Sequence, residues 1–240
     1  MTQVTMQTIE FQADGRKAAG YAAVPDQGGP GIIVLHSWWG LTPFFKGVCN
    51  RLAAERFVAF APDLNNRRVA ETLEEAKQIV KERDFPLTEA IVRSAVDQVR
   101  SLPGVKAGGL GVLGFSMGAS WALVLSALAP EDIKAAVLFY GIEGVDFTKT
   151  RAAFLGHYAE QDEWTPVEWA GQMEADIRAA GREVTFYTYP NTHHWFFEAD
   201  RPDHYAPEAI ELAWERTLKF LRVQFEQPVE ATDLQTRDAR

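Results

Sequence analysis

The sequence predicts an α/β protein with a mostly parallel central sheet that helices cover on both faces. Segments with the pattern of strands alternate with segments of helical periodicity along the 240 residues, as in sheets joined by helical crossovers. The run Gly31–Leu35 is apolar throughout, which is typical of a strand buried on both faces. With 47% apolar residues and no internal repeat or linker, residues 1–240 are expected to form one domain.

In the first half of the chain, strands over residues 4–11 and 16–24 are joined through Asp14-Gly15, a hairpin signal. The strand at 31–35 is followed by a helix over about 43–56 and a short buried strand over 57–61. A charged amphipathic helix over 72–83 is expected to cover a loop with a solvated outer face, and another helix follows over about 87–101.

In the second half, the apolar pattern predicts strands over about 109–113, 133–140, 152–158 and 183–189. Helices are predicted over about 117–129, 166–180 and 207–225, and Gly181 is suited to the left-handed position that ends the second of these. Residues 226–240 are polar and are expected to form a frayed tail.

Charge and composition exclude several classes of function. The net charge is −9 without any long Lys/Arg block, which argues against nucleic acid or an anionic membrane as a partner. Residues 1–11 lack the pattern of a signal peptide, and no run of 18 apolar residues could span a membrane. Cys49 is the single cysteine and is expected to be a buried structural thiol. A cytoplasmic location is therefore expected.

The sequence Gly114-Phe115-Ser116-Met117-Gly118 lies between a predicted strand and a predicted helix. This is the context of a nucleophile elbow, in which a sharp turn exposes the serine hydroxyl above the carboxyl edge of the sheet. Glycines on both sides give the room that strand and helix need to approach each other. The Met117 N–H then lies at the positive end of the helix, where it can stabilise an oxyanion. A serine that merely caps the helix is the alternative.

A second motif overlaps the first, because Gly109–Gly114 also satisfies Gly-x-Gly-x-x-Gly. A dinucleotide site needs a strand before that motif and a helix that opens within it. Here Pro103-Gly104 precedes the motif and the glycines fall inside the strand, so dinucleotide binding is not expected.

A serine nucleophile needs a base and a group that orients the base. Downstream of Ser116 the chain has four histidines, and two of them, His193 and His194, are predicted in a loop after a strand. His157 falls inside a predicted strand, and His204 is expected to open the last helix. The carboxylate candidates follow two other strands: Asp162 first, with Glu143, Asp146, Glu160 and Glu163 as alternatives.

The assembled chain resembles the dienelactone hydrolase family of α/β-hydrolases from about residue 5 to 223. The resemblance depends on these segments: Val34–Leu41, Arg51–Glu55, Val58–Leu64, Gly114–Gly118, Phe139–Gly141, Asp162 with Pro166, and Tyr189-Pro190 with His194 and Phe196. It implies the α/β-hydrolase fold, Asp162 as the acid, and His194 rather than His193 as the base. It also implies that the backbone N–H of Trp38 is the second oxyanion donor.

Three positions depart from what the resemblance implies. Ser116 replaces a cysteine nucleophile, Ser37 replaces a glutamate, and Glu198 replaces an arginine that helps to bind a substrate carboxylate; Arg201 lies nearby but out of register. A neutral serine activated by histidine does not need the carboxylates that accompany a thiolate. A glutamate in place of the arginine should disfavour an anionic ligand, so neutral esters are expected as substrates.

Four tryptophans lie on predicted loops that converge around Ser116: Trp38, Trp39, Trp164 and Trp195. They either pack the loops or form an aromatic wall for the substrate. The function expected from these residues is hydrolysis of small to medium esters by a serine triad, without a metal or an organic cofactor. The alternatives are a lactone, thioester or peptide hydrolase of the same fold, or a binding protein that retains the fold.

Overall fold

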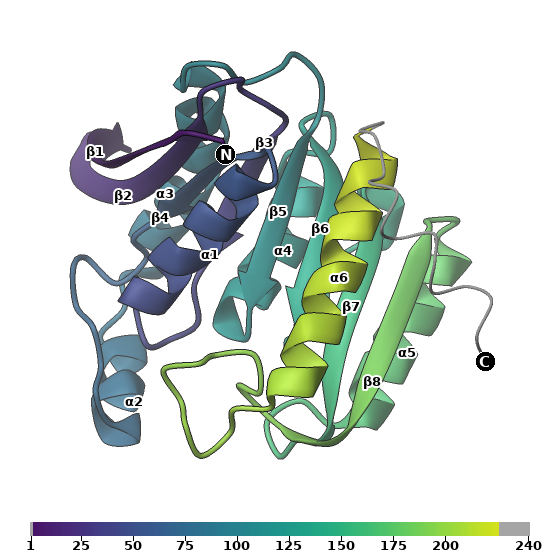
Figure 1. Ribbon diagram of the computed structural model, residues 1–240. Helices are drawn as coiled ribbons and strands as arrows, with labels where there is room; N and C mark the ends of the chain where they lie inside the picture. Colours follow the sequence, from purple (N-terminus) through teal and green to yellow (C-terminus); the bar gives the residue numbers. More distant parts are fainter. Residues whose placement is uncertain (1, 226–240) are drawn as a thin grey trace.

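The computed structural model describes residues 2–225, and the predicted frayed tail at 226–240 lies outside the described residues. One eight-stranded sheet runs through this part of the chain in the order β1-β2-β4-β3-β5-β6-β7-β8 (Figure 1). The strands are β1 (Val4–Ala13), β2 (Arg16–Pro25), β3 (Gly31–Leu35), β4 (Val58–Pro62), β5 (Leu110–Phe115), β6 (Ile133–Phe139), β7 (Ala153–Gln161) and β8 (Val184–His193). Strands β3 to β8 are mutually parallel, whereas β2 is antiparallel to both of its neighbours.

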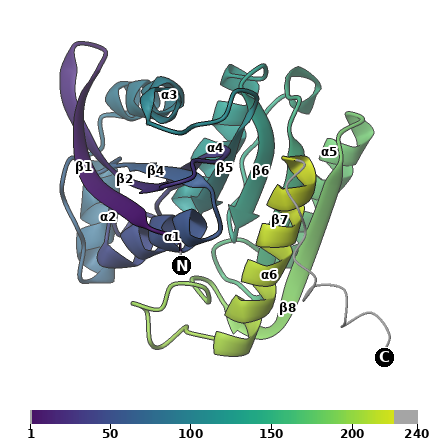
Figure 2. The same ribbon diagram turned by 45° about the horizontal axis from the view of Figure 1, so that its top comes forward.

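Helices cover both faces of the sheet (Figure 2). Helices α1 (Pro43–Ala54) and α6 (Pro207–Gln224) bury their apolar sides in one core cluster, together with α2 (Leu73–Lys81). Helices α3 (Phe85–Ser101), α4 (Met117–Leu128) and α5 (Val167–Ala179) bury theirs in the other. A short 3-10 helix, η1 (Phe147–Lys149), follows β6. The prediction of a mostly parallel sheet between two helical layers is confirmed.

Local signals in the sequence explain where the elements begin and end. All five residues of β3 are buried, as its unbroken apolar run predicts. Helix α2 begins with a capping box between Thr72 and Glu75, and α5 is followed by Gly181 at φ 74°, the left-handed position that glycine adopts without strain.

The end of β8 differs from the expectation of a loop after Tyr189. The strand continues through Pro190 to His193, and Asn191 has φ 56°. Because β8 is an edge strand, the N–H that proline lacks is not needed by a neighbouring strand. His204 also differs from expectation, since α6 begins at Pro207 and His204 lies in the loop before it; proline is favoured in the first turn of a helix.

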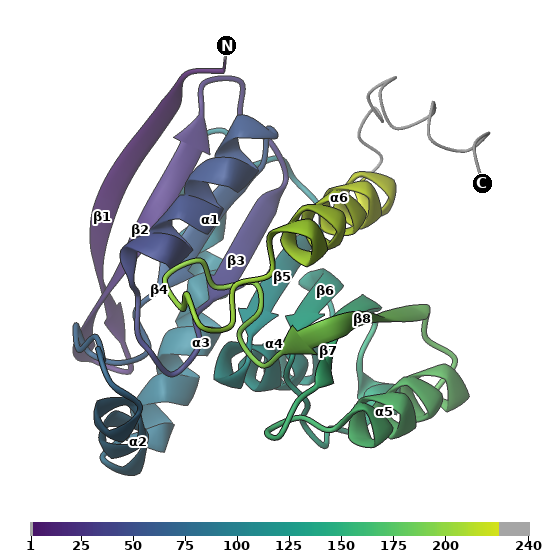
Figure 3. The same cartoon turned by 60° about the horizontal axis from the view of Figure 1, so that its bottom comes forward.

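The carboxyl ends of the parallel strands bring the predicted functional segments together. Strand registers place Leu35 beside Gly114 and Phe115 beside Phe139. The loop between β8 and α6 lies over this end of the sheet, close to α1 (Figure 3), and Thr42 Oγ1 donates to Asp200 Oδ2 at 2.9 Å. No helix within residues 2–225 has the length and hydropathy required to cross a bilayer.

Candidate active site

Ser116 lies on a tight turn between β5 and α4. Its φ of 51° and ψ of −117° are rare for a residue with a side chain and mark a strained backbone. A Cβ at Gly118 would lie 2.1 Å from the carbonyl oxygen of Leu35, so only glycine lets the first turn of α4 approach the end of β3. The sequence therefore builds the sharp turn that the motif predicts.

Ser116, His194 and Asp162 form a continuous hydrogen-bonded chain. The Ser116 Oγ lies 2.8 Å from His194 Nε2, and His194 Nδ1 lies 2.7 Å from Asp162 Oδ2 and 2.9 Å from Oδ1. A carboxylate only accepts hydrogen bonds, so Nδ1 carries the proton and Nε2 is free to accept one from the serine. Asp162 and His194 are both buried, whereas Ser116 is half-buried.

Backbone amides hold the Asp162 carboxylate in place. Its Oδ1 accepts from the N–H groups of Trp164 at 2.9 Å and Thr165 at 2.8 Å. These amides supply hydrogen bonds to a charged acceptor, which are stronger than neutral ones, and fix the face that Asp162 turns to His194.

The other candidate acids and histidines lie elsewhere. Glu143 and Glu163 are exposed, Asp146 accepts from Thr148 at the start of η1, and Glu160 accepts from the Asn191 N–H. The Nδ1 atom of His193 faces the Gln161 carbonyl at 3.2 Å, so this ring nitrogen is turned to the backbone at the end of β7.

His157 is buried in β7 and bonded on both ring nitrogens. Nδ1 lies 2.8 Å from Tyr189 Oη and Nε2 lies 3.0 Å from Thr217 Oγ1. Burial, with the nearby Arg216 charge, lowers the pKa of His157 to about 3. It is therefore a neutral residue of the core.

The predicted oxyanion donors come from two segments that the fold fixes independently. The Met117 N–H is the first amide of α4 and has no acceptor within the helix. The Trp38 N–H belongs to the loop after β3, where His36 Nε2 accepts from the Leu64 N–H at 2.9 Å. His36 Nδ1 therefore carries the proton and donates to the Ser37 carbonyl at 2.6 Å. Because the Ser37 carbonyl and the Trp38 N–H share one planar peptide, this bond also sets the direction of the N–H.

The sequence-based interpretation required Glu198 to face the substrate, but the structure buries this side chain. Its side chain is 0% exposed, with Oε2 accepting from Ser37 Oγ at 2.9 Å and Oε1 from Tyr140 Oη at 3.0 Å. The carboxyl group lies behind the loop after β3 and cannot repel an anionic substrate by direct contact. That argument for neutral substrates is wrong, and the physical reason is burial.

The four tryptophans form one cluster beside the triad. Ring centroids of Trp38 lie 5.1 Å from Trp164 and 5.8 Å from Trp195, and Trp164 lies 6.5 Å from the His194 ring. Trp39 and Trp195 are buried, whereas Trp38 is half-buried and Trp164 exposed. The first two pack the loops, and the second two can contact a ligand. The indole N–H groups of Trp38, Trp39 and Trp195 have no acceptor among the described residues.

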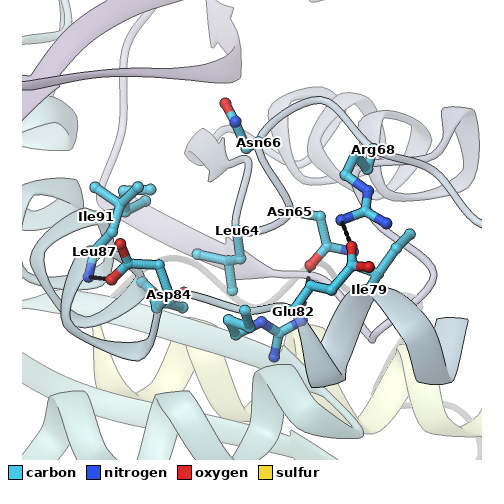
Figure 4. A pocket seen from close by; sticks show the side chains of 11 residues that line it. Leu64, Asn65, Asn66, Arg68, Ile79, Glu82, Asp84, Leu87 and Ile91 are labelled. Carbon is cyan, nitrogen blue, oxygen red and sulfur yellow. Dashed lines mark hydrogen bonds and ion pairs between the residues drawn. The ribbon is translucent and has the colours of Figure 1, made fainter.

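Sequence reasoning missed Arg83, a cation next to the predicted oxyanion residue Met117. Arg83 Nη1 contacts Met117 Sδ, Nη2 donates to Asn65 Oδ1 at 2.8 Å, and Nε is buried without an acceptor among the described residues. Burial lowers the pKa of Arg83 to about 10, so it remains charged. A cavity of about 250 Å³ adjoins it, with Asn65 at one side and Arg68 paired to Glu82 (Figure 4).

No pattern could have singled out Arg83, because it follows a run of charged residues that looks like an ordinary solvated surface. The arginine that the sequence draws attention to, Arg201, lies elsewhere, as does Arg67. The Arg201 guanidinium stacks 3.8 Å from the Trp39 ring, and Arg67 pairs with Glu10. Among residues 2–225, no group of three or more His, Cys, Asp or Glu side chains could hold a metal ion.

Comparison with known proteins shows the family to which the chain belongs. The model of the dienelactone hydrolase family matches residues 18–225. Protein usf of Aquifex pyrophilus is 32% identical over 225 residues, which cover 90% of this chain and 97% of that protein. A protein of Aquifex aeolicus (strain VF5) that carries the provisional name carboxymethylenebutenolidase is 28% identical with the same coverage.

A solved structure shows the same fold. The crystal structure of a provisionally named dienelactone hydrolase from Klebsiella pneumoniae subsp. pneumoniae MGH 78578 has a TM-score of 0.81 and 23% identity. It covers 94% of this chain, and all of that chain is matched. The architecture is therefore the α/β-hydrolase fold.

Proposed function

Because the chain belongs to the dienelactone hydrolase family, we propose that it is a serine hydrolase that cleaves carboxylic esters through an acyl-enzyme. The observation that carries this proposal is the unbroken contact chain from Ser116 through His194 to Asp162. Each of the three roles that a serine needs for nucleophilic attack has a residue in hydrogen-bond distance.

In the acylation step, His194 Nε2 takes the Ser116 proton while the Oγ attacks the ester carbonyl carbon. The carbonyl oxygen becomes an oxyanion, which the N–H groups of Met117 and Trp38 stabilise. The C–O bond to the alcohol then breaks, and His194 returns the proton to the leaving alcohol. Asp162 orients His194 and stabilises the imidazolium that forms between these events.

In the deacylation step, a water molecule replaces the alcohol. His194 takes a proton from the water, whose oxygen attacks the acyl carbon, and the same two amides hold the second oxyanion. The bond between the acyl carbon and Ser116 Oγ breaks, His194 returns the proton to Oγ, and the carboxylic acid leaves. No step requires a metal or an organic cofactor.

We propose neutral esters of small to medium size as the first class of substrate. The exposed Trp164 and the half-buried Trp38 give an aromatic surface near His194, which favours apolar acyl or alcohol groups. Arg83 already donates to Met117 and Asn65, which leaves the aromatic wall as the main recognition surface.

An ester or lactone that carries a carboxylate is the second candidate. The observation that favours it is Arg83, which makes no ion pair with an acidic side chain among the described residues. Paired substrates decide between the two: a neutral ester and an isosteric ester with a carboxylate near the scissile bond. If the anionic substrate is preferred and Arg83→Gln abolishes that preference, the second candidate is correct. Thioesters and peptides are tested in the same assay.

Replacement of Ser116 by alanine tests the function itself. Hydrolysis of p-nitrophenyl esters of graded chain length should fall on the order of 10³-fold or more, as for triad removal in other enzymes. Far-ultraviolet circular dichroism should remain that of the wild type. Retained turnover in the purified variant would exclude Ser116 as the nucleophile, and absence of hydrolysis in the wild type would favour a binding protein.

We propose that the whole chain acts as one domain on a small molecule, with neither nucleic acid nor membrane as partner. All eight described strands lie in one sheet, and the net charge of −9 opposes binding to polyanions. The buried, free Cys49 suits a reducing compartment such as the cytoplasm.

A further inference from the structure

Glu198 is a buried carboxyl group that no step of the proposed reaction uses. It is 0% exposed and holds two hydroxyl groups from distant parts of the chain, Ser37 Oγ at 2.9 Å and Tyr140 Oη at 3.0 Å. Burial of a carboxyl group is costly, so its retention beside the triad requires an explanation.

On one side, Glu198 is hydrogen-bonded to Ser37 in the loop that carries the Trp38 amide. Ser37 is held twice, by its carbonyl to His36 Nδ1 at 2.6 Å and by its hydroxyl to Glu198. The Trp38 carbonyl is held as well, because it accepts from Asn65 Nδ2 at 2.9 Å. Together these bonds leave the peptide between Ser37 and Trp38 little freedom to rotate.

On the other side, Glu198 acts on the surroundings of the base. The Tyr140 ring lies 5.0 Å from the His194 ring, and the Tyr140 carbonyl accepts from Thr165 Oγ1 at 3.1 Å. The N–H of the same Thr165 binds Asp162. The carboxyl group thus joins the loop after β3 that carries the Trp38 amide, here called the oxyanion loop, to the residues that contact His194 and Asp162.

We propose that Glu198 is a positioning residue that holds the Trp38 amide in register with His194 by binding Ser37 and Tyr140 at the same time. The proposal rests on the proposed function, since it assigns a role within that reaction. It predicts that the state of Glu198 affects the oxyanion, and therefore kcat more than KM, because the oxyanion forms only after the substrate is bound.

The charge of Glu198 gives the proposal a specific signature. Burial, followed by the charge of Asp200, raises the pKa of Glu198. The hydrogen bonds from Ser37 and Tyr140 and the charge of Arg201 lower it, and the resulting pKa is about 8. Burial also raises the pKa of Tyr140 well above its usual value, so Tyr140 remains a donor. His36 faces Ser37 in its neutral form, because burial lowers its pKa.

At neutral pH, therefore, Glu198 carries a proton. One oxygen accepts from Tyr140. The Ser37 hydroxyl donates to Oε2 when the carboxyl group is ionised, and it can rotate to accept from that oxygen when the oxygen carries the proton, so both contacts persist without a buried charge. Above about pH 8 the group ionises and places a negative charge behind the loop that must receive a negative oxyanion. The kcat of the wild type should then fall with pH.

The test compares kcat between pH 7 and pH 10 for wild type and Glu198→Gln, with the spontaneous hydrolysis of the ester subtracted. Glutamine imitates the protonated acid, since its carbonyl accepts from Tyr140 and its amide donates to Ser37. In the wild type kcat should fall about ten-fold or more over this range, because two pH units above its pKa a carboxyl is about 99% ionised. In Glu198→Gln the ratio of kcat at pH 7 to kcat at pH 10 should be close to one.

Three further variants separate positioning from mere support of the fold. Ser37→Ala removes the hydrogen bond from the Ser37 hydroxyl, which lowers the pKa of Glu198. The alkaline fall in kcat should therefore move to higher pH. Glu198→Ala should lower kcat at pH 7, with KM little changed, and glutamine should recover most of that loss. Glu143→Gln, a change at an exposed carboxylate on the loop after β6, should keep the wild-type profile.

The outcomes distinguish this inference from the proposed function. If Ser116→Ala is inactive but Glu198→Gln shows the same alkaline fall as the wild type, the role of Glu198 is wrong and the serine mechanism stands. A wild type whose kcat does not fall up to pH 10 also overturns the role of Glu198. If Ser116→Ala retains full activity, the proposed function fails first.

Discussion

At the scale of single residues, Ser37 and Glu198 occupy two of the positions at which the chain departs from its family resemblance, and they are hydrogen-bonded to each other. The resemblance implies a glutamate at the first position and an arginine at the second. Here the carboxyl group comes from the second position and the hydroxyl from the first. The two departures therefore belong to a single contact. They change which position supplies the carboxyl group, and a carboxyl group remains beside the oxyanion loop.

The adjacent histidines give the sharpest prediction at this scale. His194→Ala should lower kcat/KM on the order of 10³-fold, because without a base the serine remains a neutral alcohol. His193→Ala should cost a few-fold at most, or about 1 kcal/mol, the usual contribution of one neutral hydrogen bond. Steady-state kinetics of both variants on one ester are sufficient. Were His193→Ala the inactive variant, the assignment of Asp162 would have to be reopened too.

Glu198 should also affect the pH dependence of stability. Its pKa is raised from 4.5 to about 8 by folding, so between these values the unfolded chain releases a proton that the folded protein keeps. The group therefore stabilises the fold fully below about pH 4.5, and this contribution is lost as pH rises to about 8, by at most about 1.4 kcal/mol per pH unit.

Urea unfolding at pH 5.5 and pH 7.5 gives the free energy of unfolding of wild type and of Glu198→Gln. The difference between the two proteins at each pH measures this effect, because the contributions of the other titrating groups cancel. The stability of the wild type relative to the variant should decrease at the higher pH. An unchanged difference would mean that Glu198 titrates alike in both states.

The sequence could predict the residues whose chemistry follows from a local pattern. Ser116 lies in a motif whose flanks define strand, turn and helix, and the candidates for base and acid follow strands at the same edge of the sheet. The contact of Glu198 with Ser37 spans 161 residues, and no local pattern encodes it. Arg83 was missed for the same reason, because its contact with Met117 is set by the packing of the segment after α2 against the start of α4.

At the scale of elements, the position of Ser116 depends on how closely α4 approaches β3. Gly118→Ala would place a methyl group against the Leu35 carbonyl, so strand or helix must shift, at a cost of about 1–3 kcal/mol or more. We expect a lower melting temperature and a large loss of activity. Gly171→Ala in α5 is the matched control, because nothing lies within 4 Å of its added Cβ.

That control should be more stable by about 0.5–1 kcal/mol, the usual gain for alanine over glycine inside a helix, with unchanged kinetics. Thermal unfolding and ester hydrolysis of both variants measure the effect. If Gly118→Ala matched Gly171→Ala, the close approach of α4 and β3 would not be needed for activity.

Most helices and strands could be predicted because their apolar periodicity and end signals agree. The end of β8 could not, since Pro190-Asn191 reads as a turn and only the edge position of the strand allows it to continue to His193. The start of α6 at Pro207 agrees with the predicted start, because proline is favoured in the first turn of a helix, and only the expectation that His204 opens this helix was wrong.

At the scale of the whole molecule, one sheet joins the two helical layers, and the candidate triad draws on three loops at its carboxyl edge. Because every layer packs on the same sheet, we expect the chain to unfold as a unit. Urea unfolding followed by tryptophan fluorescence, which is sensitive to the cluster beside His194, should coincide with unfolding followed by far-ultraviolet circular dichroism. Separate transitions would contradict a single domain.

The central claim is that Ser116 forms a covalent bond with the substrate, and active-site labelling tests it most directly. The protein is treated with a fluorophosphonate or another reactive organophosphate, digested, and examined by mass spectrometry to locate the modified residue. We predict stoichiometric modification of Ser116, loss of esterase activity in parallel, and no labelling of the Ser116→Ala variant. Label on another residue, or full activity in protein whose Ser116 is modified, would contradict the mechanism.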